Sequence, residues 1–151
     1  MERTDVLIVG AGLAGLQASR LLARRGHKVV LVDRKSRLDE AVHTTGIFVR
    51  RTLEDFWLPP ECLGPPVSHV RLYSPGRRSM MLTSPHEEYR VGRMGPLYRR
   101  MLEEALAAKV DWRGNTTFVS SEPMGDGSRV ELDSPAGRTS LLARFVMGAD
   151  G

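Results

Sequence analysis

The sequence predicts an α/β fold built on a parallel sheet, and three observations in its first 33 residues support this class. The β-branched run Val6–Val9 ends at a glycine and is typical of a strand buried on both faces. Leu13–Arg25 has the composition of a helix, and Gly26 supplies its stop. Lys28–Val32 is a second buried strand, and this strand–helix–strand order produces a parallel pair.

The rest of the chain is predicted to alternate short strands with turns and to end in a β-rich segment. Pro96 opens a helix that runs to Lys109, with apolar residues at helical spacing (Leu97, Met101, Leu102, Ala105, Leu106). The other expected elements are a short strand or turn at Gly46–Val49, one or two helical turns at Arg51–Trp57, a loop marked by Pro65–Pro66, strands at Val67–Ser74, Arg78–Thr83 and Tyr89–Val91, and a meander at Thr116–Ser121, Arg129–Asp133 and Thr139–Met147. The predicted architecture is a parallel sheet with helices on both faces and an attached antiparallel β-meander.

The composition excludes several classes of protein. The 151 residues suit one domain or a piece of a larger one, and the 41% hydrophobic content argues against a wholly disordered chain. The single cysteine, Cys62, rules out an internal disulfide, a redox dithiol and a cysteine-based zinc site. No apolar run approaches the roughly 18 residues of a membrane helix, and no secretion signal precedes the first strand. A cytoplasmic protein without a transmembrane segment is therefore expected.

The charged residues and histidines show no pattern typical of a nucleic-acid-binding or metal-binding protein. Lys and Arg number 22 against 18 Asp and Glu, but arginine pairs are scattered and acidic residues lie between them. Nucleic-acid binders gather their basic residues on one face or tail, so no nucleic-acid partner is expected. The alternative is that a few arginines meet an anionic ligand. The four histidines lack metal-ligand spacing, so no metal site is expected, and no residue stands out as catalytic.

A glycine pattern lies between the first strand and the first helix. Residues Gly10, Ala11, Gly12, Leu13, Ala14 and Gly15 spell GxGxxG. In this pattern the first glycine permits a tight turn, the second lets the backbone approach a pyrophosphate, and the third lets the helix pack closely on the sheet. The helix N-terminus offers unpaired N–H groups and a partial positive charge of roughly half a unit. The sequence therefore predicts a Rossmann-like dinucleotide site.

An acidic residue follows the second strand at the expected distance. Asp33 lies 18 residues after Gly15, where a carboxylate can accept hydrogen bonds from both ribose hydroxyls of an adenosine. The same carboxylate repels a 2′-phosphate, and Arg34 beside it can offset that repulsion. We therefore expect Asp33 and Arg34 to contact the adenosine half of the ligand, with NADP disfavoured but still open.

Three segments resemble FAD-dependent enzymes of the geranylgeranyl-reductase and aromatic-hydroxylase families. Asp5–Asp33 looks like the ADP-binding unit of two-dinucleotide-binding flavoproteins. Phe145–Gly151 resembles the strand-plus-GADG element, whose acidic residue, here Asp150, helps to hold the FAD region of the fold. Val91–Arg93 resembles a strand–arginine–helix segment whose arginine, here Arg93, lies near the flavin.

Segments in the middle of the chain favour the geranylgeranyl-reductase family over the aromatic hydroxylases. Thr45–Ile47, Leu58–Pro60 and Leu72–Gly76 are similar in order and spacing to geranylgeranyl-reductase-like proteins, which often carry a cysteine at the position of His43. The resemblance implies FAD as cofactor and an FAD-dependent oxidoreductase, or its FAD-binding half. Its partners would be a small-molecule substrate and NAD(P)H or a protein as electron donor. Two alternatives remain: a non-catalytic dinucleotide-binding fragment, and an NAD(H)-binding dehydrogenase.

The resemblance also implies that the chain is incomplete. In these families the polypeptide continues well past the GADG element, so residues 1–151 are expected to be an N-terminal FAD-binding domain that lacks the full active site. Residues 67–91 are then strands of an incomplete substrate domain. Unpaired strand edges favour association with other chains. Two assemblies are therefore compatible with the sequence: a homo-oligomer, or a complex with the missing C-terminal part.

Overall fold

A computed structural model describes all of residues 1–151 and divides them into two compact units. The sheet unit comprises Met1–Ala41 and Tyr98–Gly151, and the middle unit comprises Val42–Leu97. No helix in the chain combines the length and the apolar character that crossing a membrane requires.

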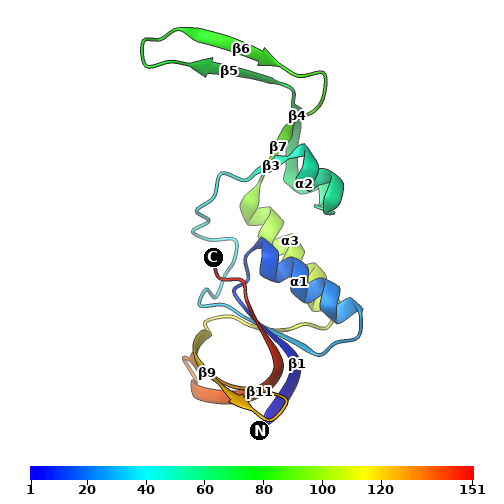
Figure 1. Cartoon of the computed structure of the whole chain (residues 1–151), viewed down its shortest axis with the longest axis vertical. Coiled ribbons are helices and arrows are strands. Elements are labelled where there is room, and N and C mark those ends of the chain that lie inside the picture. Colours follow the sequence, from blue (N-terminus) through cyan, green and yellow to red (C-terminus); the bar gives the residue numbers. More distant parts are fainter. The chain divides into compact units, whose positions relative to one another are not determined.

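The sheet unit is built on a six-stranded sheet in the order β8-β2-β1-β11-β10-β9. Its strands are β1 (Glu2–Val9), β2 (Val29–Val32), β8 (Asp111–Arg113), β9 (Thr117–Met124), β10 (Gly127–Ser134) and β11 (Gly137–Gly148). The pairs β8–β2, β2–β1 and β1–β11 are parallel, whereas β11, β10 and β9 form an antiparallel meander. Strand β11 therefore belongs to both parts, and Figure 1 shows it beside β1.

Helix α1 (Leu13–Arg24) makes the crossover between β1 and β2. The sequence favours this unit because β2 consists of four fully buried aliphatic residues and α1 buries Leu16 against the strands. Gly26, with a φ of +90°, follows the helix and turns the chain back toward β2. The predicted strand–helix–strand unit is thus present with its boundaries shifted by only a few residues.

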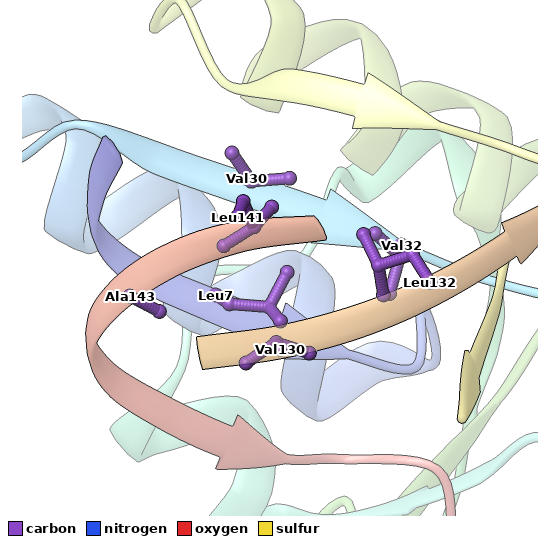
Figure 2. Close-up of a cluster of buried hydrophobic side chains, with 7 residues drawn as sticks. All are labelled: Leu7, Val30, Val32, Val130, Leu132, Leu141 and Ala143. Atoms are coloured by element: carbon purple, nitrogen blue, oxygen red, sulfur yellow. The ribbon is translucent and has the colours of Figure 1, made fainter. Parts of the chain in front are cut away.

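One face of the parallel sheet is covered by the meander. Leu7, Val30 and Val32 pack there against side chains from β10 and β11, as Figure 2 shows (Val130, Leu132, Leu141, Ala143). Because neighbouring residues of a strand point to opposite faces, Val6 and Ile8 face the other side, where α1 lies. The structure differs here from the expected helices on both faces: the curved meander takes the place of one helical layer.

Helix α3 (Met94–Ala107) ends in the sheet unit and is tied to α1 by charge. The carboxylate of Glu104 lies 2.6 Å from a guanidinium nitrogen of Arg24 on α1 and 2.9 Å from one of Arg100 on its own helix. Of the predicted apolar stripe, Met101 and Ala105 are buried, whereas Leu106 is exposed. The buried positions are four residues apart and form one narrow contact face.

The middle unit consists of short elements. They are β3 (Ile47–Val49), α2 (Arg50–Asp55), a 3-10 turn (Pro60–Cys62), β4 (Leu63–Val67), β5 (His69–Tyr73), β6 (Ser79–Thr83) and β7 (Tyr89–Gly92). Strands β3, β7 and β4 form an antiparallel sheet in that order, and β5 and β6 form a separate hairpin. The hairpin turn is formed by Ser74–Arg77, in which the Arg77 N–H donates to the Ser74 carbonyl over 2.9 Å.

Three local predictions were wrong. Pro65 and Pro66 lie inside β4 rather than in a loop, and they are tolerated because β4 is an edge strand that needs few N–H donors. The expected strand Val67–Ser74 is divided between β4 and β5. Pro96 is the third residue of α3, not the first. Proline is tolerated there as well, because an N–H at the third position would have no partner within the helix.

The meander-facing core predicts a large stability difference between two leucines. Replacing Leu141, which is 1% exposed, with alanine should lower the free energy of unfolding by about 2–5 kcal/mol, because a cavity remains in the core between the meander and the strands β1 and β2. Leu106→Ala is the control, since that side chain is 48% exposed, and should cost less than about 1 kcal/mol. Urea denaturation measures both, and equal costs would contradict the assigned core.

Candidate dinucleotide site

The glycine turn, Gly10–Gly15, lies where three strands of the sheet unit end. The Gly10 N–H donates to the Val32 carbonyl at the end of β2 over 2.8 Å, and the Ala149 N–H donates to the Val9 carbonyl at the end of β1 over 2.7 Å. The chain leaves β1 toward β2 on one side, while β11 pairs with β1 on the other. Ligands of open α/β sheets bind at such a switch point, outside the carboxyl ends of the strands.

Gly10 is held in a conformation that a side chain would not allow. Its φ is +104°, and a Cβ atom there would lie 2.5 Å from the Ala149 carbonyl oxygen. The GADG element that follows β11 therefore lies directly against the turn. Asp150, whose Cα would be 2.7 Å from that Cβ, is exposed beside it.

Gly15 and Gly12 differ in what surrounds them. A Cβ on Gly15 would lie 1.9 Å from the Gly10 carbonyl oxygen, so a glycine is needed for α1 to pack on the turn. A Cβ on Gly12 would meet only the Ala149 carbonyl oxygen, at 3.9 Å, and the Gly12 backbone (φ −71°, ψ −175°) is extended. The protein itself leaves room at Gly12, which is what a cradle for a ligand requires.

The N-terminus of α1 opens on this space without a cap. Gly12 is the N-cap residue, no side chain caps the helix, and its first turn carries no acidic residue. The first hydrogen bond of the helix runs from the Leu16 N–H to the Gly12 carbonyl. The N–H groups of Leu13, Ala14 and Gly15 precede it and have no helical partner. They are donors for an anion at the positive end of the helix dipole.

The Asp33 carboxylate is bonded to the turn. Its Oδ2 accepts the Ala11 N–H over 2.7 Å, and its Oδ1 accepts the Lys35 N–H over 2.8 Å. Each oxygen retains a lone pair that can accept a hydroxyl hydrogen. Because the Ala11 N–H donates to Asp33, it is not available as a donor to a ligand. Arg34 is exposed at the neighbouring position.

The backbone of Asp33 is held by a segment that was not predicted from the sequence. The Asp33 N–H donates to the Arg113 carbonyl over 3.2 Å, and its carbonyl accepts the Thr116 N–H over 2.9 Å. Arg113 ends β8, a three-residue strand that pairs with β2. Gly114 and Asn115, which follow Arg113, form a common turn signal and indicate that a strand ends there.

Arg93, the remaining predicted residue, belongs to the middle unit. Its guanidinium donates to the Glu61 carbonyl, and its N–H donates to the Cys62 carbonyl over 2.8 Å. Both bonds tie it to the 3-10 turn Pro60–Cys62. The structure thus brings Gly10–Gly15, Asp33 and Asp150 together in the sheet unit and gives Arg93 partners of its own in the middle unit.

The fold and the turn define the class of dinucleotide-binding α/β proteins. The chain belongs to the FAD binding domain family, which it matches over residues 3–151. FAD is accordingly the cofactor of this domain, which confirms the prediction made from the glycine and GADG motifs.

Relatives with assigned names are reductases and hydroxylases. The chain is 28% identical over 161 aligned residues to a digeranylgeranylglycerophospholipid reductase of Picrophilus torridus, which covers 97% of this chain and 39% of that protein. It is 25% identical to a 3-(3-hydroxy-phenyl)propionate/3-hydroxycinnamic acid hydroxylase of Mycolicibacterium smegmatis, covering 97% of this chain and 28% of that protein. The chain therefore spans less than half of either relative.

A solved structure shares the fold over the whole chain. A geranylgeranyl bacteriochlorophyll reductase-like protein from Thermoplasma acidophilum superposes with a TM-score of 0.86 at 21% identity, over 100% of this chain and 40% of that one. At this level of identity the likeness concerns the fold. It confirms the predicted α/β architecture with its parallel sheet and antiparallel strands.

The two glycines of the turn should respond differently to alanine. Gly15→Ala forces a Cβ onto the Gly10 carbonyl and should lower the free energy of unfolding by about 1–3 kcal/mol. Gly12→Ala has room, and the smaller freedom of its unfolded chain is opposed by the poor N-cap that alanine makes, so stability should change by less than about 1 kcal/mol. Thermal unfolding of the ligand-free proteins compares them, and the reverse order would refute the packing described for α1.

Proposed function

We propose that the turn Gly10–Gly15 binds the pyrophosphate of FAD and that the chain is the FAD-binding part of an oxidoreductase. The observation that carries this proposal is the uncapped N-terminus of α1, which opens on the space beside Gly12. The residues fit the group because an anion finds N–H donors, no acidic side chain in the first turn and no Cβ in its way.

Each residue near the turn has a part in this proposal. The N–H groups of Leu13, Ala14 and Gly15 would donate to phosphate oxygens, and Gly12 would allow the close approach. The free lone pairs of the Asp33 carboxylate would accept the ribose hydroxyls. Asp150 and Arg93 would serve the flavin half, and the exposed Arg34 would lie beside the adenosine.

The chemistry belongs to the cofactor when it is bound. FAD supplies two-electron or hydride transfer, while this chain binds and orients it. The relatives support a reductase acting on a small-molecule substrate, with NAD(P)H or a protein as electron donor. Because the chain spans about two fifths of the Picrophilus reductase, that reaction would also need residues corresponding to the remainder of such proteins.

The domain and assembly predictions remain part of the proposal. The exposed apolar side chains of β5 and β6, among them Leu72, Tyr73 and Met80, support a role for residues 67–91 in an incomplete substrate domain. From Arg144 to Gly148, β11 pairs with β1 alone, which leaves an open strand edge and supports association with further polypeptide or a second copy. The single cysteine, Cys62, is buried, which is compatible with a reducing, cytoplasmic location.

Titration of the purified protein with FAD tests the proposal. A yellow complex with the absorbance of bound flavin, from which ADP displaces FAD, is the expected result. Binding of ADP or AMP without retention of FAD would limit the function to the ADP half. A response to NADH alone would favour a nicotinamide-dependent dehydrogenase instead.

Gly12→Val should separate binding from folding. The valine side chain would fill the space beside the helix N-terminus, so the affinity for ADP should fall at least about tenfold, or about 1.4 kcal/mol. Isothermal titration calorimetry measures this fall. Gly76→Val is the matched control, because a Cβ at Gly76 in the β5–β6 turn likewise meets nothing closer than 3.9 Å. Retained ADP affinity in Gly12→Val would remove the turn from the site.

A further inference from the structure

We propose that Asp33 is a positioning residue that fixes the glycine turn before any ligand arrives, in addition to contacting the ribose. The inference rests on the proposed function, because it assigns a second task at the same site. The observation behind it is that both carboxylate oxygens already accept backbone N–H groups, from Ala11 and from Lys35. A residue that served only the ligand would not need the bond from Ala11.

The two hydrogen bonds have different consequences. The bond from Lys35, two residues along the chain, is local and fixes the orientation of the Asp33 side chain. The bond from Ala11 spans 22 positions and joins the end of β2 to the turn. Ala11 is 2% exposed, so without this acceptor its N–H would be buried with no partner. Hydrogen bonds to an ionised carboxylate are also stronger than neutral ones.

The positioning role acts on the donors that bind phosphate. Ala11 lies between Gly10, which is locked against Ala149, and Gly12, which begins the open space. With the Ala11 N–H directed at Asp33, the peptide groups that follow are set in the direction of α1, and the donors of the helix N-terminus are aligned before binding. Pre-alignment of this kind saves the ligand the cost of ordering the turn.

Asparagine distinguishes positioning from ribose binding. The two backbone N–H groups require two acceptors, and an asparagine offers one carbonyl oxygen and one NH₂ donor. Asp33→Asn therefore loses one of the two bonds, because its NH₂ group lies opposite a backbone N–H, and Asp33→Ala loses both. Ribose hydroxyls both donate and accept, so an asparagine can still bond to them. A role confined to the ribose would tolerate asparagine far better than a positioning role.

The chain contains a matched control for this substitution. Within β1, the Asp5 Oδ2 accepts the N–H of Lys28, the residue before β2, over 2.7 Å, which is also a carboxylate-to-backbone bond. Asp5→Ala removes the same kind of bond away from the turn. Any general effect of losing such a bond on the sheet unit will appear in both alanine variants, whereas an effect on the turn will appear only in Asp33→Ala.

Hydrogen exchange in the ligand-free protein gives the first test. In the wild type the Ala11 amide should exchange slowly and the Gly12 amide quickly, a result that requires no variant. Asp33→Ala removes both acceptors and should speed exchange at Ala11 at least about tenfold without changing the central β1 and β2 amides, whereas Asp5→Ala should leave Ala11 unchanged. In Asp33→Asn the faster exchange should appear at Ala11 or at Lys35, whichever N–H then faces the side-chain NH₂. Fast exchange at Ala11 in the wild type, or no change at Ala11 in Asp33→Ala, would overturn the proposal.

A ligand without ribose hydroxyls gives the second test. ADP and 2′,3′-dideoxy-ADP are titrated against the wild type, Asp33→Ala and Asp5→Ala. A positioning role predicts that Asp33→Ala weakens dideoxy-ADP several-fold or more, although no hydroxyl is present, and that Asp5→Ala does not. Equal affinity of the wild type and Asp33→Ala for dideoxy-ADP would reject it. If the wild type binds neither nucleotide, the proposed function fails while the exchange measurement still decides the role of Asp33.

Discussion

The close approach of bare backbone segments at the carboxyl end of β1 is the constraint on which the rest of the structure depends. A Cβ atom on Gly15 would lie 1.9 Å from the Gly10 carbonyl oxygen, and one on Gly10 would lie 2.5 Å from that of Ala149. Helix α1, the turn and the end of β11 are therefore packed backbone against backbone. This packing directs the N-terminus of α1 toward the open space at Gly12, where an anion can meet its unpaired N–H groups.

Much of the fold and the site could be predicted because the signals are local. The order of a buried strand, a glycine turn, a helix and a second buried strand occupies the first 33 residues, and each element is indicated by its own composition. The same holds for Asp33, whose place at the end of β2 follows from the strand boundary, and for the meander, whose three runs are separated by glycine turns. FAD as the cofactor followed from two motifs at opposite ends of the chain, and the family match confirmed it.

The parts that could not be predicted depend on partners distant in the sequence. Strand β8 has only three residues and is defined by pairing with β2, about 80 positions earlier. The placement of Pro65 and Pro66 inside β4 depends on that strand lying at a sheet edge. The Asp33 side chain was expected to face a ligand, and its bonds to Ala11 and Lys35 arise from a turn geometry that residue spacing does not encode.

The measurement that most directly tests the account is a titration of isotope-labelled protein with ADP, followed by the backbone amide resonances. We expect the largest shifts at Gly12, Leu13 and Ala14, with smaller ones near Asp33. The sheet unit also contains a hollow whose lining includes three basic residues (Arg3, Lys28 and Arg144) and two acidic ones (Asp5 and Asp126), which leaves one basic residue in excess. Shifts confined to that hollow, with the turn unaffected, would show that the glycine pattern shapes the fold and does not hold the nucleotide.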